Sequence, residues 1–556
     1  MPDRTGPSIS LVHSRTKGIP TAIFRRADGR DFYLHSRYDP LEEARFLVES
    51  VPRQERTMYA VLGFGLGYHV KALLQRIPQS SHVVVMEPDS ARLSSSLLKI
   101  EGSQAGAWMH NSRLHFLSHH DPGVAPFSLA DRLANLRLLS LKLITHIPST
   151  LTEETFYRAL LAEIPQRFPT SFQSRLNLID KMLENGLQNF WANLPHSWNA
   201  APVQSLQGMW SGRPLIIVSA GPSLTGALPA LSEAKGTALL LATGSAARIL
   251  VARQIQPDLV ISFDPYEANL EHFKGWDTSA VPLIYYHRIY RGVPALHSGP
   301  RFYFVMKDEP PIPLSRPGEE ADFRQGGSVA FSALQLAHHL DANPIIFVGQ
   351  DFAFADGHTH ADGCVVDQTF DPKALPADYF LVPGVDGNPV ATSRILHSYL
   401  LYMQEYLLDF LRLNPHVKHI NTSRIGARIR GMDYLPLEKM LESRGAPVQP
   451  FSGKLIASAL EQHQPIPQEA RKGALDRWIT ELDRLLEQAG RLTDFDRMFA
   501  RFKAGSLYAQ AARSYDDVYY LYETRYRSGK GQAFLDRFKV HLQFVLEELN
   551  RIRAAV

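Results

Sequence analysis

The chain has 556 residues, of which 45% are hydrophobic and 21% are charged, a composition typical of a globular protein with several domains. Its 59 basic and 56 acidic residues leave a formal net charge of +3, which argues against the concentrated basic surface of a nucleic-acid-binding protein. The single cysteine, Cys364, excludes an intrachain disulfide, and no secretion signal or run of roughly 20 apolar residues is seen, so a cytoplasmic location without membrane insertion is expected.

The first predicted domain, residues 1–168, is Rossmann-like. A short apolar strand at 59–62 runs into the glycine loop at 63–67, and a helix follows. A second strand at 82–86 then ends on Glu87. This order of strand, glycine loop, helix, strand and acid is typical of a nucleotide-binding unit, although a glycine loop also serves packing alone, so the role of this loop stays open.

A helical segment at 151–195 connects this domain to the next one. Its apolar residues recur at helical spacing, and Pro165 and Pro169 interrupt the pattern. Because proline disrupts helices, we expect the domain boundary near these two residues, between 168 and 169.

The second predicted domain, residues 169–445, alternates strand-like and helical segments. Helical patterns such as SAARILVARQ and SVAFSALQLAHHLD separate several of its apolar runs. This alternation favours an α/β fold with a mainly parallel sheet covered by helices on both faces. The predicted strands lie in RPLIIVSAGPSLTG, TALLLAT, DLVISFDP, PLIYYH, RFYFVM and PIIFVGQD.

The third predicted domain, residues 446–556, is helical. Two sets of apolar side chains fall at helical spacing, so each helix is expected to bury one stripe. A tyrosine stripe near the end is read either as ordinary core or as a docking surface for a helical partner. The apolar sets are Leu475, Trp478, Leu482 and Leu485, and Leu542, Val545, Leu549 and Ile552; the tyrosines are Tyr515, Tyr519, Tyr522 and Tyr526.

A glycine-containing turn follows the first strand of the central domain. Gly221 allows a tight turn, Pro222 suits the first turn of a helix, and Ser223 can cap that helix or donate to a phosphate. Because ligands of open parallel sheets bind beyond the carboxyl ends of the strands, we expect Ser219, Gly221, Pro222 and Ser223 to bind a ligand. A tight turn without any ligand is the alternative.

Further polar residues follow other strands of the same domain. Asp264 ends a strand, where it could bind substrate hydroxyls or a cation, or cap the turn at Pro265. Gly326, Gly327 and Ser328 precede a helix and offer another N-terminus suited to an anion. We assign these residues and Gln350 to ligand binding.

The stretch GQDFAFADGHTHADG, residues 349–363, carries the candidate catalytic groups Asp351, His358 and His360. Its spacing matches no zinc motif, so no residue is predicted as a metal ligand. An acid/base role is better supported, because histidine titrates near neutral pH. A solvated polar loop without chemistry is the remaining alternative.

Several of these segments together resemble the bacterial motility accessory factor (Maf) proteins. The resemblance rests on IIVSAGPSL, on GGSVAFSALQLAHHLDANPIIFVGQDFAFADGHTHA, on HINTSRIGARIRG and on LGFGLGYHV with VVVMEPD, and it spans roughly residues 58–435. This chain has Thr422-Ser423-Arg424-Ile425 where related sequences often carry an acid, and Phe354 where a tyrosine is common.

The resemblance implies a flagellin glycosyltransferase with a sialyltransferase-like central domain, which supports flagellar assembly and motility. Such an enzyme transfers a nonulosonic acid, of the pseudaminic or legionaminic type, from a CMP-activated donor to Ser or Thr hydroxyls. The implied partners are flagellin and the CMP-sugar, not nucleic acid. No cofactor is required, although Mg²⁺ or Mn²⁺ is compatible with the site. Which nonulosonic acid is used, which flagellin residues are modified and the oligomeric state are left open.

The chemistry of such a donor assigns roles to the candidate residues. Bond cleavage develops positive charge on the sugar and negative charge on the departing CMP, which peptide N–H groups at helix starts would stabilise. Asp351, His358 and His360 would handle the protons of the acceptor hydroxyl and the phosphate.

Two other functions are weighed against the transferase. The MptE-like domain superfamily includes 6-hydroxymethylpterin diphosphokinases, which use ATP and magnesium, but the chain has no G-x-x-x-x-G-K-[ST] motif. A non-catalytic flagellin-binding chaperone is the other alternative.

Overall fold

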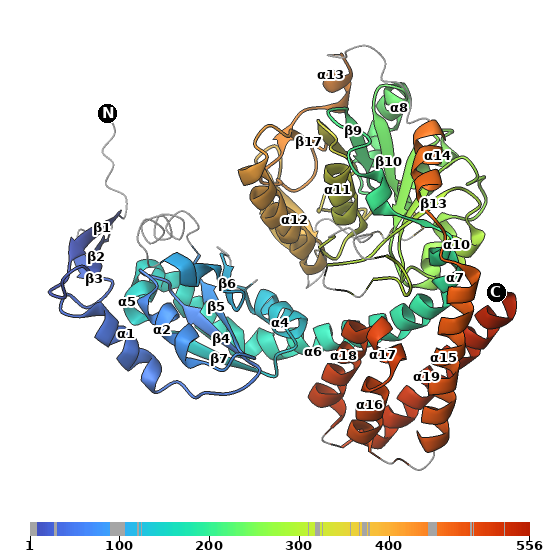
Figure 1. Ribbon diagram of the computed structural model, residues 1–556. Helices are drawn as coiled ribbons and strands as arrows, with labels where there is room; N and C mark the ends of the chain where they lie inside the picture. Colours follow the sequence, from blue (N-terminus) through green and yellow to red (C-terminus); the bar gives the residue numbers. More distant parts are fainter. Residues whose placement is uncertain are drawn as a thin grey trace. The chain divides into compact units, whose positions relative to one another are not determined.

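The chain forms two compact units, residues 1–179 and residues 180–556, in a computed structural model (Figure 1). The described residues are 8–26, 30–88, 106–118, 122–123, 125–307, 309, 311–316, 323–324, 326–355, 357–365, 367, 369, 375, 379–442, 453–489, 492, 494–527 and 529–556.

The first unit opens with a small antiparallel sheet of three strands. Strands β1 (Ser8–His13), β2 (Pro20–Arg25) and β3 (Asp31–Tyr33) pair in this order. Helix α1 (Pro40–Glu49) follows, and the side chain of its N-cap residue Asp39 accepts hydrogen bonds from two backbone N–H groups of the first turn.

A parallel sheet of four strands forms the centre of the first unit, as the sequence predicts. Its order is β6-β5-β4-β7, and every neighbouring pair is parallel. The glycine loop joins β4 to α2, and Gly63, Gly65 and Gly67 all have positive φ, which glycine adopts at little cost. The strands are β4 (Thr57–Leu62), β5 (His82–Met86), β6 (Leu114–Leu117) and β7 (Ser140–Thr145); the helical segments are α2 (Tyr68–Arg76), η1 (Gly106–His110), α4 (Ala125–Asn135), α5 (Ile147–Thr150) and η2 (Leu151–Glu153).

Strand β4 is buried on both faces of this sheet. Tyr59 and Val61 pack in one apolar cluster with α2, whereas Met58, Ala60 and Leu62 pack in a second cluster with α4. Successive side chains of a strand point to opposite faces, so a strand covered on both sides must be apolar throughout.

The expected interruption at Pro165 and Pro169 is wrong, because both prolines lie inside one helix, α6 (Glu154–Ala192). The side chains of Leu160, Ile164 and Leu176, before and after the prolines, are buried. Their packing outweighs the cost of about 3 kcal/mol that an interior proline imposes on a helix. The two compact units divide between residues 179 and 180, within this helix.

The second unit is built on a nine-stranded sheet of order β18-β17-β14-β9-β10-β11-β12-β13-β8. All neighbouring pairs are parallel, which confirms the predicted α/β fold. The strands are β8 (Ala201–Pro202), β9 (Leu215–Val218), β10 (Leu239–Thr243), β11 (Leu259–Ser262), β12 (Leu283–Tyr286), β13 (Arg301–Phe304), β14 (Ile345–Val348), β17 (His419–Asn421) and β18 (Asp433–Tyr434).

The strand order reverses direction at β9. Strands β10 to β13 follow β9 along one side of the sheet, whereas β14 returns to pair with β9 on its other side. The switch point therefore lies between β9 and β14, and ligands of open α/β sheets bind at the carboxyl ends of the strands at such a point.

Helices and one hairpin complete the sheet-containing part of the second unit. Helix α11 is buried along most of its length and packs in one apolar cluster with β9, β10 and β11. The elements are α7 (Leu194–Trp198), η3 (Val203–Leu206), α8 (Leu224–Ala234), α9 (Gly244–Ala252), η4 (Glu267–His272), α10 (Gly292–Leu296), α11 (Val329–His339), β15 (Tyr379–Pro383), β16 (Pro389–Ser393), α12 (Arg394–Leu413), α13 (Leu437–Glu442) and α14 (Gly453–Gln462).

The last part of the second unit is helical, as predicted, and forms the orange-to-red group in Figure 1. Both predicted apolar sets are buried. The tyrosine stripe belongs to the core, because Tyr515 and Tyr522 are buried and Tyr519 donates a hydrogen bond to Asp496. The elements are α15 (Gln468–Ala489), α16 (Phe495–Lys503), α17 (Ser506–Gln510), α18 (Ala512–Leu521), the π-helical turn η5 (Tyr522–Tyr526) and α19 (Gly531–Ala555).

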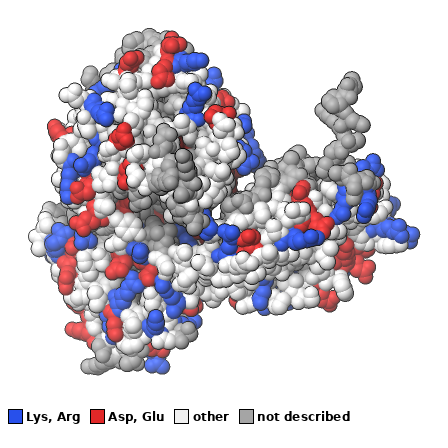
Figure 2. All heavy atoms as spheres, turned by 180° about the vertical axis from the view of Figure 1, so that it is seen from behind, with Lys and Arg blue, Asp and Glu red and all other residues white. Residues whose placement is uncertain are grey.

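Two expectations from the composition concern the distribution of charge on the surface and the presence of membrane-spanning helices. Figure 2 shows Lys and Arg side chains interspersed with Asp and Glu side chains over the face it presents. Among the helices that the structure describes, none combines the length and the apolar character needed to cross a membrane.

Candidate functional site

The loops after β9 and β14 run side by side at the switch point of the large sheet. The N–H group of Ser219 donates to the carbonyl of Val348, and the N–H group of Gly221 donates to the carbonyl of Gly349, both over 2.9 Å. The ladder between the two strands thus continues into the loops. It brings the predicted residues Ser219 to Ser223 beside Gln350 and Asp351.

Asp351 binds the glycine turn directly. Its carboxylate accepts hydrogen bonds from the backbone N–H of Ser223, over 2.8 Å, and from the hydroxyl of Ser223, over 2.6 Å. The residue is only 2% exposed, and this burial raises the pKa of its carboxyl, although the hydrogen bonds from Ser223 act in the opposite direction. Asp351 therefore fixes the position of Ser223 at the start of α8.

The predicted residues Ser219 and Gln350 also bind each other, because the hydroxyl of Ser219 donates to the side-chain oxygen of Gln350 over 2.9 Å. The two loops approach so closely that glycine is required in both. Gly349 has a φ of +71°, and a Cβ there would lie 2.0 Å from the carbonyl oxygen of Ser219. A Cβ on Gly221 would lie 2.5 Å from both a carboxylate oxygen of Asp351 and the carbonyl oxygen of Gly349.

Both histidines of the candidate site contact the carboxylate of Asp367, His358 through its ring and His360 through its backbone N–H. Nδ1 of His358 lies 2.8 Å from the carboxylate, which also accepts the N–H groups of Thr359 and His360 over 3.1 and 2.9 Å. Desolvation raises the pKa of Asp367, but the hydrogen bonds from His358 and its neighbours outweigh it and lower the pKa overall. Asp367 therefore orders the loop that carries both histidines.

This histidine loop, residues 357–363, lies against the glycine turn. The N–H of Ala361 donates to the carbonyl of Ala220 over 2.9 Å, and the N–H of Asp362 donates to the hydroxyl of Thr225 over 3.0 Å. The ring of His360 is partly buried, and this burial lowers its pKa despite the opposing charge of Asp367. The structure thus joins the glycine turn, Asp351 and the histidine loop in one site.

Asp264 lies at the end of β11 and caps the turn that follows, which is the capping alternative considered from the sequence. Its carboxylate accepts the N–H of Tyr266 over 2.9 Å, and burial raises its pKa. Its carbonyl accepts hydrogen bonds from Asn269 and Tyr290.

The turn formed by Gly326, Gly327 and Ser328 lies at the same edge of the sheet, because α11 runs from it to the start of β14. The side chain of Ser328 accepts the N–H of Phe331 as the N-cap of α11. Gly327 has a φ of +76°, and a Cβ there would lie 2.4 Å from the ring of Tyr399. Within the described residues, no hydrogen bond joins this turn to the turn at Ser219 to Ser223.

Three residues of this site were not predicted from the sequence. Asp367 lies beyond the histidine stretch, and Thr225 lies just past the glycine turn. Ala427 donates its N–H to the carbonyl of Asp351 over 2.8 Å, so the segment after β17 also holds the catalytic candidate. The polar run after His358 is the sequence signal for Asp367. Thr225 directly follows the predicted glycine turn, and Ala427 lies in the segment HINTSRIGARIRG, but no role was predicted for either.

Parts of this chain are similar to known proteins. Residues 188–357 match the family model described as "6-hydroxymethylpterin diphosphokinase MptE-like", which is the superfamily that the resemblance to the Maf proteins implies for this part of the chain. An uncharacterized protein of Treponema pallidum (strain Nichols) is 23% identical over 382 residues, which are 64% of this chain and 63% of that protein. The chain thus spans less than two thirds of the length of this relative.

Among the solved structures that are similar to this chain is a glycosyltransferase structure. It is described as the structure of MAf glycosyltransferase from Magnetospirillum magneticum AMB-1, and it matches with 16% sequence identity and a TM-score of 0.47. The match covers 99% of this chain and 91% of the other.

Proposed function

We propose that the chain is a glycosyltransferase that moves a nonulosonic acid from a CMP-activated donor to Ser or Thr hydroxyls of flagellin. The observation that carries this proposal is the joining of the glycine turn, Asp351 and the histidine loop at the switch point of the parallel sheet. The nucleotide of the donor and a histidine that transfers protons would then lie at the same edge of the sheet. The identity of the donor and the acceptor rests on the Maf resemblance.

Asp351 acts in this proposal as a positioning residue and not as the base. Its carboxylate is buried and accepts both hydrogen-bond donors of Ser223, so an acceptor hydroxyl would have to displace Ser223 to reach it. The carboxylate also takes the place that an anion would occupy at the N–H of Ser223. The donor phosphate would therefore bind further along the first turn of α8, at the N–H groups of Thr225 and Gly226, and at the turn before α11.

His358 is the general base of the proposed reaction. The Asp367 carboxylate beside Nδ1 favours the tautomer with the proton on Nδ1 and the lone pair on Nε2, which is the form that accepts a proton from the attacking hydroxyl. His360 would stabilise the departing phosphate by a hydrogen bond. Burial lowers the pKa of His360, so at neutral pH its ring is mainly neutral and offers an N–H group to the phosphate.

A pterin diphosphokinase is the second candidate, because the matched family model carries that description. Magnesium-dependent transfer from ATP needs carboxylates that can bind the ion beside the phosphates. The two acidic residues that follow β11 and β14 already hold backbone N–H groups, Asp264 that of Tyr266 and Asp351 that of Ser223. This favours the transferase.

The test is to incubate the purified chain with a CMP-nonulosonic acid and flagellin and to measure the intact mass of flagellin. Transfer adds the mass of one or more sugars, and the H358Q variant should lose it. A parallel reaction with ATP, Mg²⁺ and 6-hydroxymethylpterin should leave ATP unchanged. Binding of flagellin without a mass shift would favour the chaperone, and consumption of ATP with the pterin would favour the kinase.

A further inference from the structure

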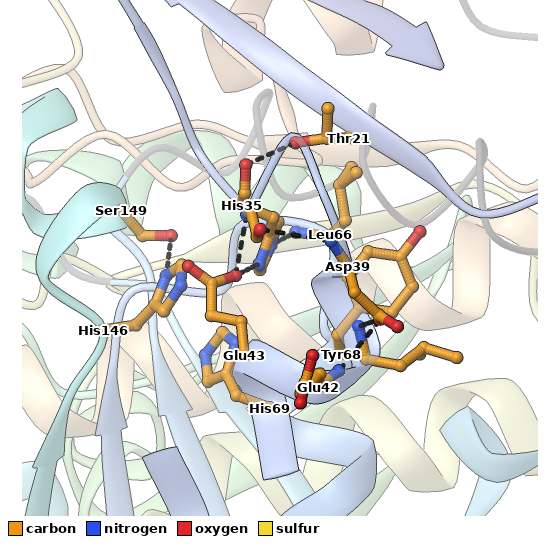
Figure 3. A network of polar contacts seen from close by, with 12 residues as sticks. Thr21, His35, Asp39, Glu42, Glu43, Leu66, Tyr68, His69, His146 and Ser149 are labelled. Atoms are coloured by element: carbon orange, nitrogen blue, oxygen red, sulfur yellow. Dashed lines mark hydrogen bonds and ion pairs between the residues drawn. The ribbon is translucent and has the colours of Figure 1, made fainter. Parts of the chain in front are cut away.

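Three buried histidines meet in the first unit (Figure 3). His35 follows β3, His69 lies in the first turns of α2, and His146 directly follows β7. One side-chain nitrogen of each lies within 4.8 Å of the others. The three residues are 2%, 2% and 3% exposed, so the sheet edge, the glycine loop and the segment after β3 enclose them.

In His69 and in His146, one ring nitrogen has a hydrogen-bond partner and the other has none. Nε2 of His69 lies 3.0 Å from the carbonyl oxygen of Gly63, so it carries the proton and donates it, which leaves a lone pair on Nδ1. Nδ1 of His146 lies 2.6 Å from the hydroxyl of Ser149. Nδ1 of His69 and Nε2 of His146 are buried and have no hydrogen-bond partner.

This pattern is typical of histidines that bind a metal. Such a histidine usually gives its second nitrogen to a backbone carbonyl or another polar group, which fixes the tautomer and the direction of the ligating lone pair. Gly63 and Ser149 provide such partners here. Other buried histidine nitrogens of the described residues also lack a partner, but those of His69 and His146 lie in one cluster with a third histidine, so their lone pairs can bind a single ligand.

His35 offers the third nitrogen. Its Nε2 accepts the backbone N–H of Leu66 over 2.9 Å and therefore carries a lone pair, while its Nδ1 lies 3.4 Å from the carboxylate of Glu43. The glycine loop encloses this atom, because a Cβ on Gly65 would lie 2.6 Å from Nε2. His35 can bind an ion by exchanging the Leu66 N–H for it, with Glu43 as its outer partner.

The chemistry of the cluster selects the kind of ion. Neutral imidazole nitrogens suit zinc and the other divalent transition metals, whereas Mg²⁺ and Ca²⁺ require oxygen ligands. Burial lowers the pKa of His69 to about 3 and that of His146 well below its usual value, so both rings are in the neutral form that coordinates.

We propose that His35, His69 and His146 bind a divalent transition-metal ion of the zinc class, through Nε2, Nδ1 and Nε2 respectively. The fourth position is left to water or to an incoming group. The bound ion would tie the segment after β3 to the glycine loop and to the end of β7. This proposal rests on residues of the first unit and does not depend on the proposed function.

Binding of the metal ion requires the three imidazole rings to move from their stacked arrangement. The rings of His69 and His146 stack with centroids 4.1 Å apart and an interplanar angle of 13°, and those of His35 and His146 stack at 4.7 Å and 26°. Lone pairs lie in the ring planes, so the rings must rotate out of this stack. Tetrahedral zinc places its nitrogen ligands about 3.4 Å apart, so the nitrogens also approach one another.

The test uses the full chain, purified without a metal-binding tag and treated with a chelator. Titration with Zn²⁺ should give one tightly bound ion per chain, and Co²⁺ should give the visible absorption of a four-coordinate ion. Both should be lost in H69Q and H146Q. The matched control is H115Q, in the same sheet, because the nitrogens of His82 and His115 lie 3.0 Å apart and bind each other, so this variant should keep the ion.

X-ray absorption of the zinc-loaded wild-type chain keeps the proposal testable if a variant does not fold. It should show an inner shell with three imidazole nitrogens, and zinc, unlike Mg²⁺, should raise the melting temperature. The proposal is overturned if the wild-type chain binds no zinc at micromolar concentration. It is equally overturned by a shell without imidazoles, or by folded H69Q and H146Q variants that bind zinc as well as the wild type.

Discussion

The carboxylate of Asp351 accepts both hydrogen-bond donors of a single residue, the N–H and the hydroxyl of Ser223. These residues come from the loops after β14 and β9, which are far apart in the sequence. The pair therefore joins the two loops at the switch point of the sheet and fixes the position of the first turn of α8. A ligand that binds at this edge would contact a turn whose conformation these hydrogen bonds already hold.

The first prediction concerns the hydroxyl in this pair. Ser223→Ala removes one of the two donors and leaves a buried carboxylate partly unsatisfied, so the free energy of unfolding should fall by about 1–3 kcal/mol. Urea denaturation measures this change. The control is Ser398→Ala, since that hydroxyl only bonds the carbonyl of Ile395 on an exposed part of α12 and should cost less than about 0.5 kcal/mol. Equal effects of the two substitutions would contradict the role of the pair.

A second prediction concerns the closeness of the two loops. Gly221→Ala places a Cβ 2.5 Å from the carbonyl oxygen of Gly349, a backbone atom that cannot move without shifting the loop. We expect a loss of about 1–3 kcal/mol in the free energy of unfolding, together with loss of CMP-sugar binding in calorimetry.

The matched control for this prediction is Gly473→Ala, which lies inside α15 and outside the proposed site. A Cβ on Gly473 meets only the end of the Arg477 side chain, at 3.9 Å, so alanine should stabilise the chain by about 0.5–1 kcal/mol and leave CMP-sugar binding unchanged. If both variants shift the unfolding free energy in the same direction, tight packing at Gly221 is not the cause.

A third prediction separates the roles of the histidine and its carboxylate. His358→Gln removes the proposed base and should reduce kcat for sugar transfer by about 10²–10⁴-fold. Asp367→Asn keeps the shape of the side chain but no longer favours the tautomer with a lone pair on Nε2, so it should also reduce kcat and shift its pH profile while leaving KM for the donor nearly unchanged. Steady-state kinetics between pH 5 and 9 would show this split. A folded Asp367→Asn variant with the wild-type kcat would remove Asp367 from the mechanism.

The sequence predicted the sheet of the second unit well because its physical signal is local. Short apolar runs bounded by glycine, proline and aspartate became buried parallel strands, and the rule for carboxyl ends correctly placed Ser219, Gly221 and Asp351 at one edge. The rule could not show that Asp351 binds Ser223, because that contact depends on the register of β9 and β14.

Long-range contacts also explain what the sequence missed. His35 follows β3, His69 lies in α2 and His146 follows β7, and only the topology of the first unit brings them together. In α6, local reasoning gave the wrong result, because burial of side chains around Pro165 and Pro169 outweighed the local preference of proline. In the first case a local sequence pattern could not predict the cluster, and in the second it predicted the wrong structure. Tertiary packing determined the result in both.

The last prediction concerns pH. His297 is 3% exposed and its Nε2 lies 2.9 Å from the carbonyl oxygen of Val281; burial lowers its pKa to about 4. The unfolded chain binds this proton near pH 6.5, whereas the folded chain binds it only near pH 4, so the unfolded state holds more protons between these values. Stability is therefore lost as the pH falls through this window, and His297 alone should account for about 2 kcal/mol between pH 7 and pH 5.

The variant His297→Gln keeps a donor for the Val281 carbonyl but removes the titrating group. Urea denaturation at pH 7 and pH 5 should show that its free energy of unfolding falls by about 2 kcal/mol less than that of the wild type. His416→Gln, at an exposed position, is the control and should follow the wild-type pH dependence. If His297→Gln loses as much stability as the wild type over this range, then His297 is protonated in the folded chain, and the burial that we assign to it does not exclude the charge.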